Sequence, residues 1–562
     1  VSPENPAMGA ELAPNIVLAG AEAQRHHRGS SHYNKALWFI ASIAVLGVLA
    51  PLLVIATSWA TDQTDIWQHL IATQLSDLLR NTFVLLLGVG TGVTIIGVGL
   101  AWLTAMCEFP GRRYFEWLLM LPMAMPAYVL AFVGLGMLDS TGPLQFWLSQ
   151  HLFDFKPVDI RNEFTVIAVL TLVLYPYVYM LSRSAFLAQS SDTIEAARVL
   201  GCGYWQGFFK VALPMARPAI IAGVSLALME TLADFGTVAV FNYDTFTTAI
   251  YKSWFGFFKL QAAAQLASLL LLFVGLTLFA ERYSRGRRGF VQGGRLMSRH
   301  RVRLSPTKSY FAMLACGLVL SVAFVIPLCQ LIFWVVAQGS DQWNARFTKL
   351  LYHSMQLAGL AALITVTLAL VLAMARHVSR GWRRQFLDLS QLGYALPGSV
   401  LAVGVVISFA QLEHWLVYPL QDLLGVPQKQ ILLGSIFTLL AAYWIRFLAV
   451  ATGPVQASIE RIRPSIPEAA QTFGVTGVQL AWKITLPMLR PGLLTALVLV
   501  FVDVMKEMPA TLLLRPYGWD TLAVRIYELT SEGEWQRAAL PAVTIVLLGL
   551  VPVMMAVRKS SR

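Results

Sequence analysis

Long apolar runs separated by short polar segments dominate this chain of 562 residues. A helix needs roughly 20 apolar residues to cross a bilayer, because each residue advances about 1.5 Å along the axis. Runs of that length recur throughout the sequence, and Gly or Pro inside them is tolerated in membrane helices. The pattern predicts an all-α polytopic membrane protein with about twelve spans. They are expected near 36–59, 79–104, 114–137, 164–188, 218–240, 260–280, 310–337, 351–375, 386–410, 431–453, 491–512 and 537–557.

The second half of the chain repeats the first at a nearly constant offset in numbering. The stretch "EAARVLGCGYWQGFFKVALPMARP" (195–218) aligns without a gap with "EAAQTFGVTGVQLAWKITLPMLRP" (468–491), at an offset of 273. "MAMPAYVLA" (123–131) likewise matches "YALPGSVLA" (394–402) at an offset of 271. Each half holds six predicted spans, so we expect two parallel six-helix repeats related by an axis along the membrane normal.

Charged residues lie between the spans and indicate their orientation. They make up only 13% of the chain, and Lys and Arg gather above all in 281–309, which holds nine of them against one Glu. The positive-inside rule explains this clustering, so the net charge of +12 does not point to nucleic acid. We expect a mobile cytoplasmic tail at 1–35, a first half at 36–280, a basic cytoplasmic linker at 281–309 and a second half at 310–562. Both termini are then cytoplasmic.

Other chemistry is sparse in this sequence. The four cysteines show no metal-ligand spacing, and the nine histidines share no helix face. No nucleophile–base pairing stands out, so an enzyme is not expected. The glycine-rich stretch "GVGTGVTIIGVG" (88–99) lies inside a span and is expected to allow close helix packing.

The repeated segment predicts a helix–turn–helix hairpin in each half, at 195–217 and 468–490. In the first copy "EAARVL" favours a helix that Gly201 ends, and a second helical stretch follows to about residue 211. Leu-Pro is expected to stop that stretch, and Pro218 to open the next span. We expect both hairpins to project into the cytoplasm.

Each hairpin resembles the signature of permease subunits of binding-protein-dependent ABC importers. That signature reads E-A-A, three residues, G, nine residues, an aliphatic residue, one residue, L-P. The matching residues are Glu195, Ala196, Ala197, Gly201, Leu213, Pro214, Glu468, Ala469, Ala470, Gly474, Leu486 and Pro487. The resemblance implies a type I importer permease fold in a bacterial inner membrane, surrounded by lipid. It also implies that each hairpin docks on one of two copies of a cytoplasmic ABC ATPase, and that a periplasmic binding protein delivers the cargo.

The chain contains no phosphate-binding loop of the form G-x-x-x-x-G-K-[ST]. Without that lysine and the hydroxyl of the following residue, a nucleoside triphosphate and its Mg²⁺ have no binding site. ATP and Mg²⁺ are therefore expected on a separate ATPase subunit, and no cofactor is expected on this chain.

Two acidic pairs interrupt the spans that follow the hairpins. Glu230 and Asp234 in the first half correspond to Asp503 and Glu507 in the second, at the same offset as the hairpins. On continuous helices each pair shares one face, about 6 Å apart along the axis. Carboxylates inside a span cost several kcal/mol unless solvated or paired, so they usually mark a pathway.

We therefore predict a substrate pathway through these four acids, with Glu230, Asp234 and Glu507 as transient ligands of a hard cation. The structural alternative places the acids near span ends or in salt bridges. Lys506 is a candidate partner that neutralises one of them, and the first half has Ala233 at that position.

Residues 232–255 and 505–542 resemble the corresponding stretches of fused ferric-iron importer permeases. The resemblance implies a permease that moves ferric iron from a periplasmic ferric-iron-binding protein to the cytoplasm by alternating access. Permeases for thiamine or polyamines remain alternatives. A secondary transporter with two six-helix halves explains the spans and the acids but leaves the hairpins without a role.

Overall fold

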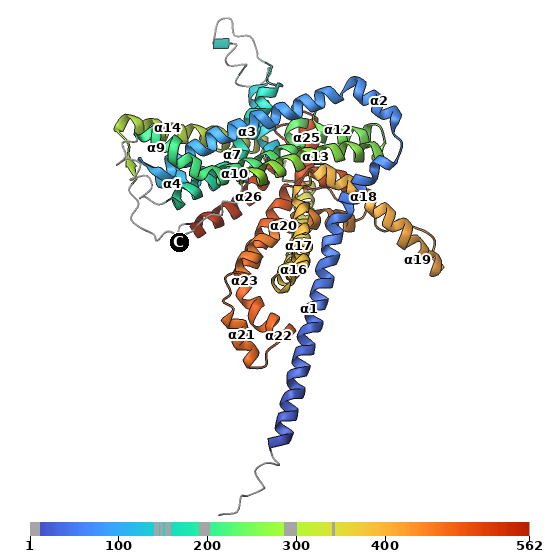
Figure 1. Ribbon diagram of the computed structural model, residues 1–562. Helices are drawn as coiled ribbons and strands as arrows, with labels where there is room; N and C mark the ends of the chain where they lie inside the picture. Colours follow the sequence, from blue (N-terminus) through green and yellow to red (C-terminus); the bar gives the residue numbers. More distant parts are fainter. Residues whose placement is uncertain are drawn as a thin grey trace, which may run out of the picture. The chain divides into compact units, whose positions relative to one another are not determined.

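The computed structural model describes residues 12–139, 145, 150–151, 159–189, 203–285, 301–339 and 343–560. Within these ranges nearly all regular structure is helical (Figure 1). The α-helices are α1 (Leu12–Thr57), α2 (Thr64–Thr73), α3 (Leu75–Met106), α4 (Arg112–Leu118), α5 (Ala127–Leu138), α7 (Glu163–Ala188), α9 (Tyr204–Gly207), α10 (Leu213–Ala233), α11 (Gly236–Val240), α12 (Phe246–Tyr251), α13 (Leu260–Arg285), α14 (Pro306–Leu320), α15 (Ile326–Gln338), α16 (Ala345–Val378), α17 (Trp382–Asp388), α18 (Gly398–Leu412), α19 (Tyr418–Leu423), α20 (Ile436–Ile459), α21 (Ser465–Thr472), α22 (Gly477–Leu480), α23 (Leu486–Lys506), α24 (Pro509–Leu514), α25 (Leu522–Ser531) and α26 (Ala539–Ser560).

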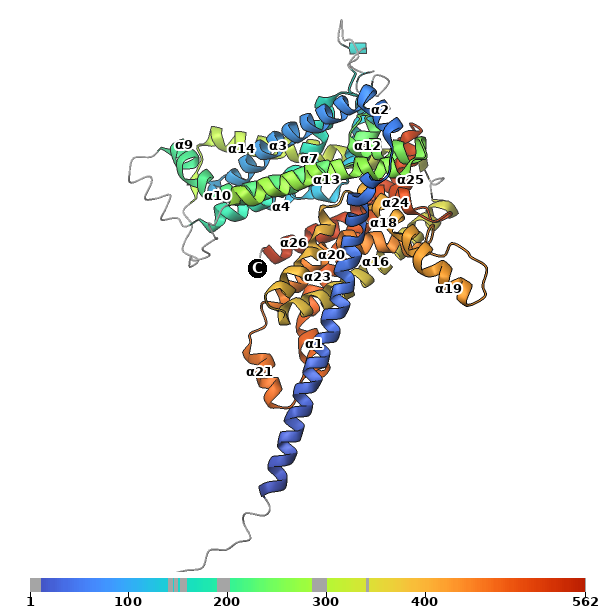
Figure 2. The ribbon, with the colours of Figure 1, turned by 45° about the vertical axis from the view of Figure 1, so that its right-hand side comes forward.

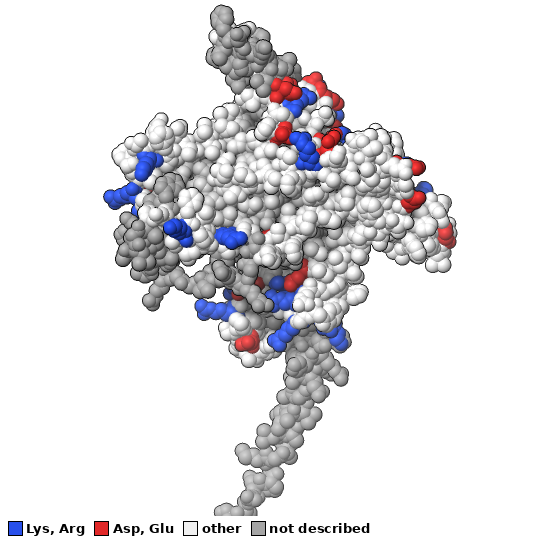
Figure 3. All heavy atoms as spheres, turned by 45° about the horizontal axis from the view of Figure 1, so that its top comes forward, with Lys and Arg blue, Asp and Glu red and all other residues white. Residues whose placement is uncertain are grey.

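The candidate spans of the described chain agree with the expected number. Ten helices are long and apolar enough to cross a membrane. The pair Arg112–Ala124 and Ala127–Leu138, bent by 88° at its break, adds one, and the shorter helix Ala539–Met555 adds another. On the face drawn in Figure 3, broad areas of the described surface carry no Lys, Arg, Asp or Glu, as lipid contact requires. The prediction of an all-α polytopic membrane protein with about twelve spans is confirmed.

The chain divides into two compact units that do not follow the predicted halves. The first comprises residues 1–50, 359–394 and 443–501, and the second comprises 51–358, 395–442 and 502–562. The division into 36–280 and 310–562 therefore rests on the sequence repeat.

Close helix packing through glycine builds the second unit. α3, α7, α10 and α13 lie side by side in it (Figure 1, Figure 2). A Cβ added at Gly88 would lie 2.5 Å from Ile167, and one at Gly97 would lie 2.7 Å from Val178. Small residues let helix backbones approach closely where the hydrophobic effect is absent. The packing role expected for residues 88–99 is confirmed.

The first unit has an apolar core where α1 meets the end of α16 and α17. Leu37, Ala41 and Val45 of α1 pack against Leu372, Ala375 and Leu387, and Trp38 packs beside them. The Trp38 ring meets Trp382 edge to face, with 6.0 Å between centroids. The Arg383 guanidinium lies 5.5 Å above the Trp38 ring and adds a cation–π contact.

Two segments at the boundaries of the predicted regions differ from expectation. The mobile tail was predicted over 1–35, whereas α1 is already helical from Leu12; whether this segment moves stays a prediction. The linker predicted over 281–309 begins within α13 and ends in the first turn of α14, and it contains β2 (Val302–Arg303), which pairs in parallel with β1 (Cys107–Glu108). Residues 286–300 lie outside the described residues.

A wide π-helical turn precedes an Xaa-Pro pair at four places in the described chain. Proline lacks an N–H group, and its ring clashes with the carbonyl four residues earlier. A turn with i→i+5 hydrogen bonds holds one more residue and relieves this conflict. The four turns are Phe208–Ala212, Ser321–Val325, Glu413–Val417 and Ala481–Thr485.

The wide turns correct the predicted helix boundaries. Leu213-Pro214 and Leu486-Pro487 do not stop a helix, because the chain stays helical through both pairs. The spans run over Phe208–Ala233 and Gly477–Lys506 instead of 218–240 and 491–512. Pro218 and Pro491 accordingly lie inside α10 and α23 rather than opening a span. The span predicted at 386–410 is likewise displaced to Gly398–Leu423.

Candidate functional site

The acidic pairs of the predicted pathway lie across helix ends in both halves. α10 ends one residue before Asp234, and α23 ends one residue before Glu507, so only Glu230 and Asp503 are helical. Asp234 already has an extended backbone, with ψ of 128°. The expectation that each pair shares one helix face is therefore wrong. The chain leaves the helix here because each acid serves the short helix that follows.

Asp234 caps the beginning of α11. Its Oδ1 accepts hydrogen bonds from the backbone N–H groups of Thr237 at 3.0 Å and Val238 at 3.2 Å, and its Oδ2 accepts one from Thr237 Oγ1 at 2.9 Å. The first amides of a helix have no partner within the helix, and a carboxylate satisfies them well. Thr247 Oγ1 donates to the Asp234 carbonyl at 2.8 Å and ties α12 to the same turn.

Glu507 repeats this arrangement at the beginning of α24. Its Oε1 accepts a hydrogen bond from the backbone N–H of Ala510 at 3.1 Å, and Thr511 Oγ1 donates to the Glu507 carbonyl at 2.7 Å. The side chain is only 6% exposed. Each acid thus binds the amide three residues later, at equivalent positions of the two repeats. The sequence repeat extends to individual hydrogen bonds.

Glu230, Asp503 and Lys506 form a charged group in the last turns of α10 and α23. All three side chains are half-buried. The Lys506 ammonium donates a hydrogen bond to the Met123 carbonyl at 3.1 Å. A role of Lys506 in neutralising one of the acids stays a prediction.

The predicted metal ligands are not gathered in this structure. Over the described ranges, no three His, Cys, Asp or Glu side chains lie close enough together to bind a metal ion. Asp234 and Glu507 instead direct oxygen atoms to backbone amides at span ends, as the structural alternative predicts. A transient metal role for Glu230, Asp234 and Glu507, and a pathway role for all four acids, stay predictions.

A junction of three elements lies beside these helix ends, and sequence reasoning missed it. A Cβ added at Gly236 of α11 would lie 2.7 Å from Tyr128 Cβ in α5 and 2.8 Å from Met508 Cε just before α24. The Tyr128 hydroxyl is buried without a hydrogen-bond partner, and so is that of Ser399, the residue at the equivalent position. The signal was available, because both residues follow Pro in the second repeated motif.

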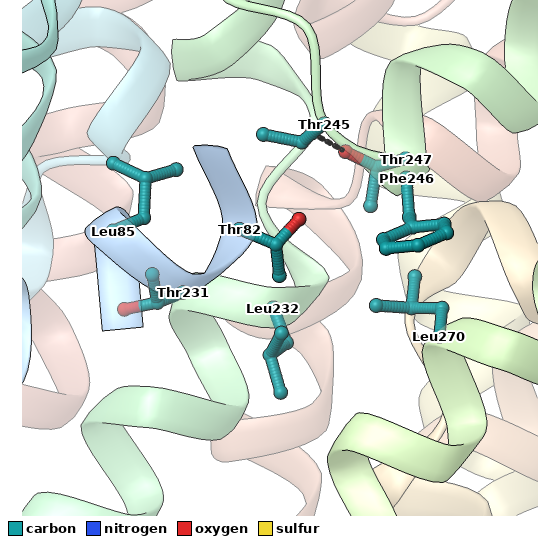
Figure 4. Close-up of a pocket in the computed structure, with 8 residues that line it drawn as sticks. All are labelled: Thr82, Leu85, Thr231, Leu232, Thr245, Phe246, Thr247 and Leu270. Atoms are coloured by element: carbon teal, nitrogen blue, oxygen red, sulfur yellow. Dashed lines mark hydrogen bonds between the residues drawn. The ribbon is translucent and has the colours of Figure 1, made fainter. Parts of the chain in front are cut away.

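A small cavity adjoins the Asp234 turn (Figure 4). Its volume of about 10 Å³ is enough for a single water molecule. The Thr82 hydroxyl is buried without a hydrogen-bond partner and points toward the side formed by Thr245 and Thr247. The lining residues are Thr82, Leu85, Thr231, Leu232, Thr245, Phe246, Thr247 and Leu270.

The second hairpin, in the first unit, shows why its signature needs glycine. α21 contains Glu468, Ala469 and Ala470, and the chain turns at Gly474 with φ of +77°. The Val475 N–H donates to the Ala470 carbonyl and the Gly474 N–H to the Gln471 carbonyl, each at 3.0 Å. This pair of bonds is the Schellman motif, which requires a left-handed residue at the glycine position.

Large apolar side chains of the second hairpin face outward. Phe473 is 85% exposed and Trp482 is 67% exposed, and Glu468 is also exposed. Exposed aromatic residues on a polar hairpin are typical of a protein-binding surface. In the first hairpin Leu213 and Pro214 begin α10, while Glu195, Ala196, Ala197 and Gly201 lie outside the described residues.

Comparison with known proteins gives one family that matches in both halves, and relatives that cover different shares of the chain. The family described as "Binding-protein-dependent transport system inner membrane component" matches residues 94–286 and again 365–561, which confirms the tandem repeat. The "Fe(3+)-transport system permease protein FbpB 2" of Haemophilus influenzae is 28% identical over 530 residues, covering 92% of this chain and 97% of the relative.

Two further relatives are more distant or shorter in coverage. The "Ferric transport system permease protein FbpB" of Actinobacillus pleuropneumoniae is 24% identical and covers 82% of this chain and 68% of its own length. The "Sulfate transport system permease protein CysW" of Escherichia coli is 34% identical over 26% of this chain and 49% of its own length. With matches in both halves that together span more than half of its length, this chain belongs to the family of binding-protein-dependent transport system inner membrane components.

Proposed function

We propose that this chain is the permease subunit of an ATP-driven ABC importer and that its cargo is ferric iron. Both halves of the pathway lie on this single chain, because the family matches twice. A periplasmic ferric-iron-binding protein delivers the ion, and two copies of a cytoplasmic ABC ATPase bind the hairpins. ATP and Mg²⁺ are held by those ATPase subunits, and no cofactor belongs to this chain.

The cargo assignment rests on the full-length likeness to the Haemophilus influenzae relative, which is named for Fe(3+) transport. Family membership alone leaves the cargo open, since a sulfate permease of Escherichia coli also matches part of the chain. The acids at the ends of α10 and α23 favour a cation over an anion. Hard carboxylate oxygens suit a small, highly charged ion.

Uptake by the whole complex in proteoliposomes tests the cargo. We expect labelled iron to enter when binding protein and ATP are present, and labelled thiamine and putrescine to stay outside. The double substitution Glu230→Gln and Asp503→Asn keeps nearly the same side-chain shapes and removes two negative charges. We expect iron uptake to fall at least about tenfold, which corresponds to roughly 1.4 kcal/mol in the effective barrier.

Asp244→Asn is the matched control for this uptake experiment. Asp244 is an exposed acid of the same unit, paired with Lys252 at 2.6 Å, and is not one of the four acids of the predicted pathway. It should transport iron as the unchanged protein does. Uptake of thiamine or putrescine without iron rejects the cargo, and full iron uptake by the double variant rejects the acids.

The glycine turn of the second hairpin offers a test of the proposed coupling role. Gly474→Val places a β-branched residue at a positive φ, which such residues essentially never adopt. We expect ATP hydrolysis to lose its dependence on cargo-loaded binding protein. Gly425→Val imposes the same strain at φ of +66° in a loop outside the hairpin, and should leave coupling intact. Normal coupling in Gly474→Val contradicts the assignment.

The proposed orientation places both termini, the 281–309 linker and the hairpins in the cytoplasm. The span Gly477–Lys506 is about 45 Å long, so the residues before and after it emerge on opposite sides of a bilayer. In a cysteine-free background, a cysteine at Phe473 should react only from inside, and one at fully exposed Tyr517 only from outside. Labelling of Phe473→Cys from outside overturns the orientation.

A further inference from the structure

A buried hydroxyl of α3 faces a cavity of the second unit. Thr82 is 4% exposed, and among the described residues its Oγ1 has no hydrogen-bond partner. The hydroxyl points toward Thr245 and Thr247, where α12 begins (Figure 4). A buried hydroxyl that stays unpaired costs about 1–3 kcal/mol, and native proteins rarely leave one so. The arrangement therefore indicates a partner that is not part of the chain.

The side of the cavity opposite Thr82 can accept a hydrogen bond but cannot donate one. Thr247 Oγ1 donates to the Asp234 carbonyl at 2.8 Å, so it is the acceptor in its 2.9 Å contact with Thr245 Oγ1. Thr245 Oγ1 in turn accepts from the amide of Thr248 as the cap of α12. A hydroxyl has one hydrogen and two lone pairs, so both oxygens have used their hydrogen and keep acceptor capacity.

The second half closes the corresponding contact with a direct hydrogen bond. "LLRNTF" (78–83) matches "LLYHSM" (350–355) at an offset of 272, which pairs Thr82 with Ser354. In the chain, α25 follows α23 and α24 as α12 follows α10 and α11. Ser354 Oγ accepts a hydrogen bond from the amide of Leu522, the first residue of α25, at 2.8 Å. In the first half a cavity of about 10 Å³ lies at this contact.

We propose that one water molecule occupies the cavity and bridges Thr82 of α3 to the Thr245–Thr247 pair. The volume suits a single water, and hydroxyls on two sides supply the polar partners that a buried water needs. The water donates one hydrogen to the Thr245–Thr247 pair and accepts the hydrogen of Thr82. The lining residues include no acid, so a metal ion would be buried there without a compensating charge.

The bridging water connects α3 to the turn that carries one of the predicted pathway acids. Thr247 Oγ1 binds the Asp234 carbonyl, so the hydrogen-bonded chain runs from Thr82 through the water to that turn. A bridging water is enthalpically nearly as good as a direct hydrogen bond. The same joint is thus hydrated in the first half and dry in the second, and this difference does not depend on which cargo the chain moves.

Thr82→Val keeps the side-chain shape and removes the hydroxyl, so the sign of its effect on the Tm tests the proposal. With a water in place, valine removes one of its few partners, and we expect the Tm of the full-length protein in detergent to fall by on the order of 1 °C. In an empty cavity, valine would only remove an unpaired hydroxyl. A Tm that rises or stays unchanged therefore overturns the proposal.

Thr171→Val is the matched control in α7 of the same unit. The Thr171 hydroxyl is also buried without a hydrogen-bond partner in the described chain, but a Cβ added at Gly92 would lie 2.6 Å from it, so packing there is tight. The same substitution should leave the Tm unchanged or raise it, because no water loses a partner. A loss equal to that of Thr82→Val would show that removing a hydroxyl is enough to explain both, and would overturn the proposal.

An experimental map of the full-length protein that shows ordered water gives the direct measurement. We expect a peak within hydrogen-bond distance of Thr82 Oγ1 and of Thr245 or Thr247 Oγ1. An empty cavity, or a direct bond from Thr82 to either threonine, overturns the proposal. Exchanging Na⁺ for choline should leave the Tm unchanged, and a Tm that rises with Na⁺ in the unchanged protein but not in Thr82→Val would identify a cation in place of the water.

Discussion

The ends of α10 and α23 have the same backbone but different surroundings. In both, an acid directly after the helix caps the next short helix through the amide three residues later. At equivalent positions in and after this shared turn, the first half has Ala233, Gly236 and Phe255, whereas the second has Lys506, Pro509 and Glu528. The comparison teaches that the repeat conserves the turn as a structural unit, while charge and packing around it are specific to each half.

We expect the largest loss of stability at Gly236 of the first half, where the packing leaves no room for a side chain. Gly236→Ala would place a Cβ 2.7 Å from Tyr128 Cβ and 2.8 Å from Met508 Cε, so one of these elements must move. Such overpacking costs about 1–3 kcal/mol. Thermal unfolding of the purified protein in detergent should show a clear loss of stability.

Gly134→Ala provides the matched control for this loss. Gly134 lies in α5, the same helix as Tyr128, and an added Cβ there meets no atom within 4 Å. Alanine favours a helix over glycine, so this variant should be neutral or slightly more stable. Equal stability of the Gly236 and Gly134 variants would show that the junction is loosely packed.

The helix caps Asp234 and Glu507 should differ, by a smaller amount, in how much they stabilise the fold. Asp234→Ala removes a carboxylate that accepts from two backbone amides and a hydroxyl, while Glu507→Ala removes a carboxylate that accepts from the Ala510 amide. Losing a cap costs about 0.5–2 kcal/mol, so we expect Asp234→Ala near the upper end and Glu507→Ala near the lower. Denaturation of both variants measures the order. Asp234→Asn and Glu507→Gln keep an acceptor oxygen and should recover most of the loss, and a reversed order of the alanine variants would refute the cap comparison.

The smallest effect concerns pH and Glu528, which stands where the first half has Phe255. Burial raises the pKa of the Glu528 carboxyl, but hydrogen bonds and charges of Arg515 and Arg525 outweigh it and hold the pKa below its ordinary value. Because the folded pKa is depressed, this stabilisation is present above about pH 4.3, the unfolded pKa, and is lost as pH falls through the folded pKa.

We therefore expect Glu528→Gln to be less stable than the unchanged protein at pH 7 and to approach it in stability below pH of about 4. Thermal unfolding over this range measures the difference between the two proteins. Phe255→Gln should differ from the unchanged protein by the same amount at every pH. A pH-independent gap for Glu528→Gln would mean that the Arg515 and Arg525 contacts do not stabilise the fold.

The sequence predicts the spans well and their ends poorly, for a physical reason. A run such as residues 79–104 is long enough to demand a bilayer, so length alone places α3. Helix ends depend on single backbone hydrogen bonds. Glu507 followed by Met508 and Pro509 carries a helix-start signal, since Pro favours the first helical position, but the surrounding apolar run predicts a continuing helix.

The candidate site shows the same limit. The repeat identified the four acids and the glycine turn of the hairpin, because both recur at one constant offset between the halves. The contact of Lys506 with Met123 joins residues 383 positions apart, and no periodicity encodes such a contact. The π-turns also escaped prediction, since one additional residue in a helical run leaves the hydrophobic pattern nearly unchanged.

The wide turns before Leu213-Pro214 and Leu486-Pro487 have a geometric consequence for the hairpins. One residue in an α-helix corresponds to a rotation of about 100°, so a turn that holds one extra residue changes the azimuth of everything before it. The turns Phe208–Ala212 and Ala481–Thr485 thus set the direction, about the helix axis, in which the residues before each turn leave the span. Deleting a single residue from the turn Ala481–Thr485 would rotate the second hairpin, with its exposed Phe473, away from the ATPase subunit that we propose it contacts.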